Sequence, residues 1–407
     1  MDLNLDRLFA RGRGRSFLMI PGPTEIPWRV ISAMMKPSCD HHDPAFNIGV
    51  LDSTLIRMRD LFQTQNEIIA VPGSGRVGQQ AAINSLIEPG DKVLCIVAGI
   101  FGGWMREMVQ RIGGKTVELS VGWGKAFDAR EVETLLAQGE FKAITMVHNE
   151  TTTGSAYPIK EIGGLAKKHD ALFIVDTVSS LGGVDIRTDE WNIDVNLTAS
   201  HKCIAAPTGL AILSISQKAW RTMEVRKTPA MDFAYDLHRW KKMWIPPERG
   251  GSLLFGFRRQ PITMPIYLVY ALQEAVTMAL EEGIENRFRR HRASGEAVRR
   301  AAQALGLDLY SDPSIASATL TAIKIPAGID GRKVINTMKE EFGIQIAGGL
   351  EKLSGAIWRI AHMGVVASPD FILPTLRALE GALKQAGFSA RSGSGVDVAA
   401  AVFSGTT

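Results

Sequence analysis

Ala171-Leu172-Phe173-Ile174-Val175-Asp176 is the stretch that decides the fold of this chain. Its first five residues are apolar without polar alternation, which is typical of a strand buried on both faces of a parallel sheet. Asp176 closes the run, so its carboxylate is expected at the carboxyl end of the strand, where active sites of open α/β sheets gather. The stretch therefore predicts a buried sheet with a functional carboxylate at its edge.

Two more apolar runs lie upstream, at residues 92–97 and 143–147. Amphipathic segments at residues 103–113 and 159–169 are predicted to be helices. Buried strands that alternate with helices are the signature of βαβ units, in which the sheet is mostly parallel. The first part of the chain is therefore expected to be an α/β domain.

The second part of the chain changes its pattern. A long helical stretch at residues 277–305 is followed by predicted strands at 316–325 and 342–347 and by a closing helix at 369–386. This pattern predicts a smaller α+β domain. The expected organisation is an N-terminal arm at 1–30, a large domain at 31–276, a small C-terminal domain at 277–388 and a flexible tail at 389–407, in which 396–403 could still dock.

Length and composition are those of an ordinary globular protein. The chain has 407 residues, of which 45% are hydrophobic and 22% charged, enough for one large and one smaller domain. No apolar run approaches 18 residues, so no transmembrane helix and no membrane partner are expected. The net charge of +4 is small and basic residues are interspersed with acids, which argues against a nucleic-acid partner.

The cysteines and the amino-terminal residues indicate in which cellular compartment the protein is expected. Cys39, Cys95 and Cys203 have neither a disulfide pattern nor a metal-ligand spacing, so no metal is expected and a reducing, cytoplasmic location is favoured. The amino end contains Asp2 and Asp6 and lacks an apolar core, so it does not resemble a signal peptide. It is expected to be an arm that docks on a partner subunit.

Lys202, in the segment Ser200-His201-Lys202-Cys203, is the second decisive residue. A lysine set among small residues can be desolvated enough to react with a carbonyl, and Asp176 can keep a ring nitrogen protonated by opposite-charge pairing. Taken singly, Lys202 could be an ordinary surface lysine and Asp176 could be a helix-capping aspartate. Taken together, they suggest an enzyme that uses pyridoxal 5'-phosphate.

A glycine-rich segment, Gly73-Ser74-Gly75-Arg76-Val77-Gly78, follows a predicted strand and opens a predicted helix at residues 79–87. Its amides and the helix dipole are expected to face an anion. A dinucleotide site would need an acidic residue at the tip of the next strand, where Ala98-Gly99-Ile100-Phe101 stands instead. A phosphate monoester is therefore favoured, with Ser74 and the amides of Gly75 and Arg76 as donors. Phe101 could stack on a pyridine ring or belong to the core.

Seven motifs, in this order, resemble those of class V aminotransferases, and of their alanine/serine:glyoxylate aminotransferase group in particular. The resemblance covers residues 19–386. The motifs are Pro21-Gly22-Pro23-Thr24, His42-Asp43-Pro44-Ala45-Phe46, the glycine-rich segment, His148-Asn149-Glu150-Thr151-Thr152-Thr153-Gly154, Val175-Asp176-Thr177-Val178-Ser179-Ser180, Ser200-His201-Lys202 and Trp358-Arg359-Ile360-Ala361-His362-Met363-Gly364.

The resemblance implies the fold of the fold type I pyridoxal-phosphate enzymes, with a mostly parallel mixed sheet in the large domain, and a homodimer with sites at the subunit interface. It also implies a role for each matched position. Lys202 would carry the cofactor covalently, Asp176 would pair with its ring nitrogen and Arg359 would clamp the substrate carboxylate beside Gly22. The remaining cofactor contacts would be Phe101 on the ring, Ser74, Gly75 and Arg76 at the phosphate, Thr151 or Thr152 at the phenolic oxygen, and Thr263 from the other subunit.

Two positions depart from the family pattern. His201 stands where many relatives carry glutamine, and it is either a phosphate ligand, which we favour, or a tolerated substitute. Gln260 stands where relatives often place a tyrosine, three residues before Thr263. The contact across the subunit interface is therefore left open.

The expected reaction is ping-pong transfer of an amino group from a small amino acid, such as alanine or serine, to glyoxylate or pyruvate. Arg76 also fits ureidoglycine:glyoxylate aminotransferases, whose Asn-His-His-Thr-Glu segment is missing here. Pyridoxamine:pyruvate aminotransferase is another relative, but the chain lacks its His-Gly-Glu segment. A desulfurase or lyase would need a late cysteine nucleophile, and no cysteine follows Cys203. A regulator without turnover would need a DNA-binding module, which the sequence lacks.

Overall fold

The computed structural model describes residues 16–389 and 395–405. Within them, a seven-stranded sheet has the strand order β2-β10-β9-β8-β5-β3-β4. Only β10 runs antiparallel to its neighbours, so the predicted α/β fold with a mostly parallel mixed sheet is confirmed. The strands are β2 (Glu67–Pro72), β3 (Lys92–Val97), β4 (Lys115–Ser120), β5 (Ala143–Val147), β8 (Leu172–Asp176), β9 (Val195–Ala199) and β10 (Leu210–Ile215).

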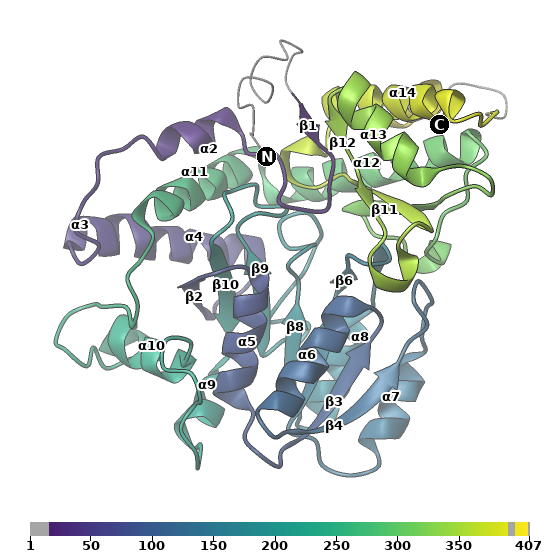
Figure 1. The fold of residues 1–407 in the computed structure, drawn as a ribbon. Coiled ribbons are helices and arrows are strands. Elements are labelled where there is room, and N and C mark those ends of the chain that lie inside the picture. The colour runs from purple at the N-terminus through teal and green to yellow at the C-terminus, as the bar shows by residue number, and fades with distance from the viewer. Residues whose placement is uncertain (1–15, 390–394, 406–407) are drawn as a thin grey trace, which may run out of the picture.

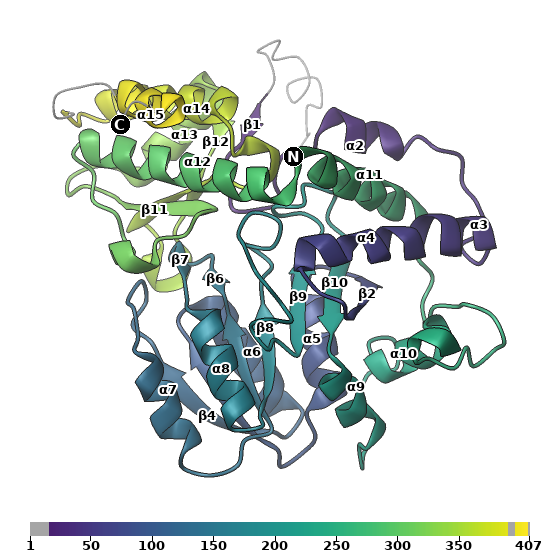
Figure 2. The same ribbon diagram turned by 180° about the vertical axis from the view of Figure 1, so that it is seen from behind.

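Helices cover both faces of this sheet, which is why its central strands are apolar throughout. Figure 1 shows α5 (Gly75–Leu86) and α6 (Ile100–Arg111) in front of the strands. Figure 2, the view from behind, shows α8 (Ile159–Lys168) in front of them. α7 (Ala129–Leu136) packs beside α8. The carboxyl ends of the parallel strands are thus left as the open edge.

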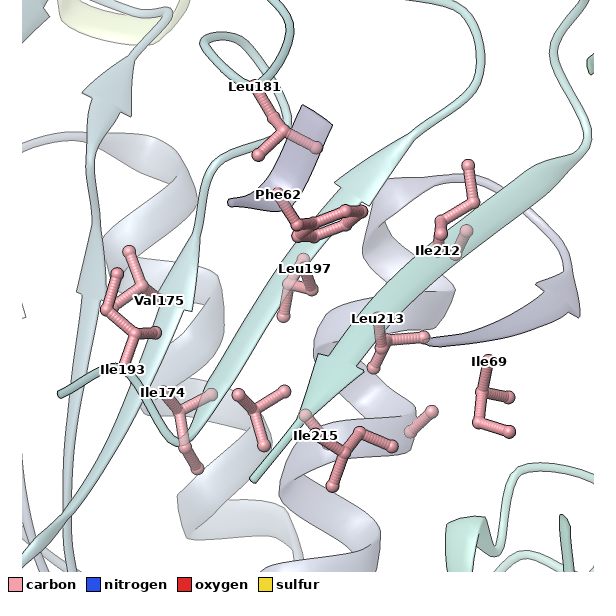
Figure 3. Close-up of a cluster of buried hydrophobic side chains, with 14 of the residues drawn as sticks. Phe62, Ile69, Ile174, Val175, Leu181, Ile193, Leu197, Ile212, Leu213 and Ile215 are labelled. Carbon is pink, nitrogen blue, oxygen red and sulfur yellow. The ribbon is translucent and has the colours of Figure 1, made fainter. Parts of the chain in front are cut away.

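The large core lies between the sheet and these helices. Figure 3 shows Ile174, Leu197, Leu213 and Ile69 on four neighbouring strands, β8, β9, β10 and β2. All four side chains are fully buried, and burial of each contributes about 1.5–3 kcal/mol. This packing fixes the strands that carry Asp176 and precede Lys202.

A second hydrophobic cluster lies in the C-terminal part, around Trp358 and Leu376. The elements of this part of the chain include α12 (Ile284–Ala304), β11 (Leu320–Lys324), α13 (Gly331–Glu341), β13 (Ala347–Gly348), β14 (Ile357–Ala361) and α14 (Pro369–Gln385). The three strands among these form a separate small sheet, with the order β11-β14-β13. The expected domain boundary at residue 277 falls inside α11 (Ile266–Glu282), and the chain turns into α12 at Gly283, whose φ is 82°.

The segment after the first described residue links the two parts. β1 (Phe17–Leu18) pairs in parallel with β12 (Ile344–Gln345). The Ala361 amide donates to the Met19 carbonyl at 2.8 Å, and the Thr24 amide donates to the His201 carbonyl at 3.1 Å. Residues 17–24 of the expected arm therefore run from the C-terminal sheet to the loop of Lys202, while residues 1–15 lie outside the described residues.

The stretch expected to be a flexible tail contains a helix, α15 (Gly395–Ser404). It packs against α12 and α14, and its Val396, Ala399 and Phe403 join the second hydrophobic cluster. The expectation of a loose tail is therefore corrected for residues 395–404. Burial of the apolar side chains in this segment stabilises the helix, although the preceding residues are rich in glycine and serine. Residues 390–394 and 406–407 lie outside the described residues.

The remaining elements are short segments outside the main sheet and the second cluster, and α9 and α10 among them pack against α5. They are α2 (Trp28–Ala33), α3 (Pro44–Phe46), η1 (Asn47–Asp52), α4 (Ser53–Phe62), β6 (Asn149–Glu150), β7 (Ser155–Ala156), α9 (Gln217–Glu224), α10 (Leu237–Trp244), η2 (Pro247–Arg249), η3 (Pro313–Ile315), η4 (Glu351–Leu353) and η5 (Gly364–Val366). None of the described helices is both long enough and apolar enough to cross a lipid bilayer.

Candidate active site

The carboxyl ends of β8 and β9 bring Asp176 and Lys202 together. The two strands are parallel neighbours, Asp176 ends the first and Lys202 follows the second by three residues. Both side chains are buried, and both line one cavity at the open edge of the sheet. Six other predicted site residues line the same cavity, namely Ser74, Gly75, Arg76, Phe101, Thr151 and His201.

Asp176 is held by two donors. The Gln79 side-chain amide donates to Oδ2 at 2.5 Å, and the Val178 amide donates to Oδ1 at 2.7 Å. Burial raises the pKa of Asp176 to about 6, and these hydrogen bonds oppose the rise. A cationic partner, such as a protonated ring nitrogen, would stabilise the ionised carboxylate further. The two hydrogen bonds therefore fix the orientation of a carboxylate that can pair with a cationic group.

Lys202 lies against the Pro21-Gly22 turn. Its Nζ donates to the Pro21 carbonyl. A Cβ on Gly22, whose φ is +106°, would lie 2.6 Å from Nζ, so only glycine permits this close approach. Burial lowers the pKa of Lys202 to about 8, with Asp176 opposing the shift. The amine can therefore gain and lose a proton near neutral pH, and Gly22 lies beside it.

The helix α5 offers an anion site at its N-terminus. Ser74 is the N-cap residue, and its hydroxyl makes no capping hydrogen bond with the helix. The first-turn amides of a helix lack intrahelical acceptors and favour a negative charge. A Cβ on Gly75 would lie 2.5 Å from the Val178 side chain, which is why glycine is needed there. The Arg76 guanidinium lies 3.9 Å from the centroid of the Trp104 ring.

Three polar atoms that line the cavity are buried without a hydrogen-bond partner among the described residues. They are Nδ1 of His201, Oε1 of Gln79 and Oδ1 of Asn149. Burial lowers the pKa of His201 to about 4, and the charge of Lys202 adds to the shift, so the imidazole is neutral. Since unsatisfied buried polar atoms are costly, the cavity fits a polar ligand with a phosphate and a heteroaromatic ring.

Phe101 and Thr151 line the cavity, whereas Thr152 lies behind it. The Phe101 ring meets the Trp104 ring edge-on, with centroids 5.1 Å apart. The Thr151 hydroxyl is 2.7 Å from that of Ser179. The Thr152 hydroxyl instead donates to Oε1 of Glu150 at 2.6 Å. Of the two predicted threonines, Thr151 is therefore the one that can reach a ligand.

Arg359 stands in the middle of β14 and is not among the residues that line the cavity. Its Nε donates to the Gly348 carbonyl at 2.9 Å and its Nη1 to the Thr151 carbonyl at 3.0 Å. Burial lowers its pKa to about 10, so it stays charged at neutral pH. Its charge helps to lower the pKa of Lys202, which places the two cations within electrostatic reach.

Thr263 is not brought to the cavity within this chain. It lies exposed between α10 and α11, and the nearby Gln260 donates to Asn47 at 2.7 Å instead. Sequence reasoning missed Gln79, Asn149 and Ser179, which also line the cavity. Gln79 lies one helical turn after Gly75 and so shares its face, a spacing that could have found it. No group of three or more potential metal ligands occurs among the described residues.

Comparison with known proteins gives consistent matches. The family model of the class-V aminotransferases matches residues 17–363. An uncharacterized aminotransferase of Methanocaldococcus jannaschii is 39% identical over 95% of this chain and 97% of its own length. A serine–glyoxylate aminotransferase of Arabidopsis thaliana is 33% identical over 95% of each chain. The crystal structure of ureidoglycine-glyoxylate aminotransferase from Bacillus subtilis superposes with a TM-score of 0.90 at 34% identity, covering 96% of this chain and 99% of that one.

Proposed function

The chain belongs to the class-V aminotransferases, and from that premise we propose that it moves the amino group of a small amino acid, such as alanine or serine, to a small 2-oxo acid. Glyoxylate is the first acceptor in this proposal and pyruvate the second. The observation that carries it is the fixed guanidinium of Arg359, within electrostatic reach of Lys202.

A small 2-oxo acid needs one carboxylate clamp and little further space. Arg359 supplies the clamp, since two of its nitrogens are held by backbone carbonyls and its fork is pre-oriented for a carboxylate. Gly22 lies against Lys202, and Gly348 lies against Arg359. Backbone rather than side chains thus borders the two cations, which suits substrates with small or no side chains.

Pyridoxal phosphate supplies an aldehyde carbon and an electron-accepting ring, the chemistry that amino transfer needs. In the proposed arrangement Lys202 would hold it covalently, Asp176 would keep its ring nitrogen protonated and Phe101 would contact the ring. Ser74, the amides of Gly75 and Arg76, and the neutral His201 would bind its phosphate. Lys202 Nζ, whose pKa is lowered to about 8, carries the proton of the substrate's α-carbon, while Arg359 orients the substrate carboxylate.

A matrix of amino donors against two acceptors tests the substrate proposal. Alanine, serine, aspartate, ureidoglycine and pyridoxamine are each offered with glyoxylate and, except for alanine, with pyruvate, and the new amino acid and the carbonyl product of the donor are quantified. We expect alanine or serine with glyoxylate to give the highest kcat/KM. Turnover confined to ureidoglycine would instead support the second candidate, which Arg76 and the similarity to the Bacillus subtilis enzyme favour. Turnover with none of the α-amino acids would overturn the proposal.

We further propose a homodimer in which Thr263 reaches the phosphate of the other subunit. Large apolar side chains are exposed near this segment and on the first helices, namely Trp28, Met35, Ile48, Phe233, Leu254, Phe255, Phe257 and Tyr267. Exposed apolar groups of this extent favour a protein interface. Mixing Lys202→Ala with Thr263→Ala subunits should restore activity, because one site of each mixed dimer has both residues. Unchanged, low activity after subunit exchange would contradict the shared site.

A cytoplasmic location is the last part of the proposal. Cys39, Cys95 and Cys203 are all free thiols, and burial raises the pKa of Cys95 and Cys203 to about 11. Protonated buried thiols without disulfide partners suit a reducing compartment. Fractionation of the source cells with an antibody against the chain would test this location.

A further inference from the structure

Glu150 is a fully buried carboxylate that the proposed chemistry does not use. It lies on β6, directly before the two threonines of the predicted site. Its Oε1 accepts hydrogen bonds from the Thr152 amide at 3.0 Å and the Thr152 hydroxyl at 2.6 Å, and its Oε2 accepts from the Gly102 amide at 3.4 Å. A buried carboxylate destabilises the fold unless hydrogen bonds satisfy it, so its position suggests that it has a structural or functional role.

The contacts of Glu150 are all with donors, as a carboxylate requires. The Ile100 amide donates to the Thr152 oxygen at 3.3 Å, so the Thr152 hydroxyl hydrogen is directed to Glu150. Every hydrogen bond described for the carboxylate therefore comes from a donor. Burial raises the pKa of Glu150 overall, and the hydrogen bonds from the Thr152 hydroxyl and from the amides of Thr152, Gly102 and Phe101 oppose this rise. The first turn of α6 is a favourable place for this negative charge.

The Glu150 carboxylate lies at the N-terminus of α6, the helix that carries Phe101. Ile100, Phe101 and Gly102 form the first turn of α6, and their amides face Thr152 and Glu150. A Cβ on Gly99 would collide with the Glu150 carboxyl group, so glycine at that position is what lets the two segments meet. The start of α6 is thereby closed to external anions, whereas the start of α5 is open.

Glu150 also lies next to the anchor of Arg359. The Arg359 guanidinium donates to the carbonyl of Thr151, the residue between Glu150 and Thr152. The charge of Glu150 acts on Arg359 and raises its pKa against the effect of burial. One carboxylate thus connects the ring-stacking Phe101 on α6 with the backbone that holds the substrate clamp.

We propose that Glu150 is a positioning residue, whose carboxylate fixes the first turn of α6 and so holds the Phe101 ring on the cofactor. This inference rests on the proposed function only in taking Phe101 as the ring-stacking residue. Glu150 itself touches neither the cavity nor the reacting atoms. Its removal should act through Phe101 and change cofactor binding before it changes the chemistry.

The test measures the affinity of the apoprotein for pyridoxal 5'-phosphate by quenching of tryptophan fluorescence, since Trp104 contacts Phe101. Glu150→Gln keeps the side-chain shape and removes the charge. We expect it to weaken cofactor affinity by about tenfold or more, the usual range for losing hydrogen bonds to a charged group. Phe101→Leu should also weaken affinity, and the double variant should be no weaker than Phe101→Leu alone.

Asp194→Asn is the matched control. Asp194 is another buried carboxylate, which accepts from the Phe173 amide at 3.0 Å and the Ser216 hydroxyl at 2.6 Å at the opposite edge of the sheet. Its replacement should lower the melting temperature without changing cofactor affinity. If Glu150→Gln does not fold, Thr152→Val, which removes the hydroxyl between Ile100 and Glu150, should weaken affinity in the same direction.

Three results would overturn the inference. They are wild-type affinity in both Glu150→Gln and Thr152→Val, an equal loss in Asp194→Asn, and losses from Glu150→Gln and Phe101→Leu that add in full. A wild-type protein that fails to bind pyridoxal 5'-phosphate would instead contradict the proposed function. The two failures are therefore distinguishable.

Discussion

Lys202 shows at the scale of one residue how burial prepares a group for chemistry. The amine is almost fully enclosed, bonded to one backbone carbonyl and within reach of the charges of Asp176 and Arg359. Desolvation disfavours its charged form, and the opposite charge of Asp176 only partly compensates. A lysine that titrates close to neutral pH is useful for proton transfer, but it costs the folded protein stability.

That cost gives a prediction for the apoprotein. Because the folded pKa of Lys202 is about 8 and the ordinary value is 10.5, the folded state disfavours the proton. Below pH 8 the lysine is charged in both states, so Lys202→Met should raise the free energy of unfolding by about 3 kcal/mol, from 1.36 kcal/mol per pKa unit. The difference should shrink as pH rises from 8 to 10.5. Urea denaturation of both apoproteins across this range checks it, and a pH-independent difference would contradict the burial argument.

Arg359 gives the second prediction at this scale. Arg359→Leu should raise the KM for the amino donor by about a hundredfold, because the proposed charged, two-pronged contact with the substrate carboxylate would be lost. Cofactor affinity should change little, since Arg359 does not line the cavity. Steady-state kinetics and a cofactor titration measure the two effects separately. Arg359→Lys, which keeps the charge without the fork, serves as the control, and wild-type kinetics in the leucine variant would refute the clamp.

At the scale of elements, the start of α12 contacts the loops that follow β8, β9 and β14. Arg287 donates to the Gly182 carbonyl at 3.0 Å and the Cys203 carbonyl at 2.7 Å. On the same helix, His291 accepts from the Gly364 amide at 3.0 Å. These loops follow Asp176, Lys202 and Arg359 in the chain. α12 therefore sets the relative position of the two parts of the site.

Arg287→Met should destabilise the fold by about 3 kcal/mol, because it leaves two buried carbonyls without donors and removes a buried partner of Glu282. Arg289→Met is the matched control, since Arg289 is exposed on the same helix and its loss should cost no more than about 0.5 kcal/mol. Chemical denaturation of both variants gives the comparison. Equal stabilities would show that the loop contacts of α12 contribute nothing.

Local patterns predicted elements well where the period of hydrophobicity was clear. The apolar run before Asp176 forms β8, and the amphipathic segment predicted at 159–169 forms α8. The long helix predicted at 277–305 is two helices, because α11 begins earlier and a left-handed glycine, Gly283, separates it from α12. A single glycine inside a helical pattern does not reveal such a turn, since the pattern continues on both sides.

At the scale of the whole molecule, contacts between distant segments escape sequence reasoning. The pairing of β1 with β12 depends on two short strands without periodicity, far apart in the chain. Several residues of the family motifs, such as Ser74, Asp176 and Lys202, do meet in one cavity. The helical spacing from Gly75 could have placed Gln79 at the cavity, but its hydrogen bond to Asp176 depends on how β8 and α5 pack. Thr263 lies outside the cavity of its own chain.

The account as a whole depends on one covalent attachment site, and chemical trapping tests it directly. The cofactor-loaded protein is reduced with borohydride and digested, and the peptides are sequenced by mass spectrometry. We expect the pyridoxyl phosphate mass on Lys202 alone, with a loss of visible absorbance and of activity. A label on another lysine, or none despite bound cofactor, would contradict the site.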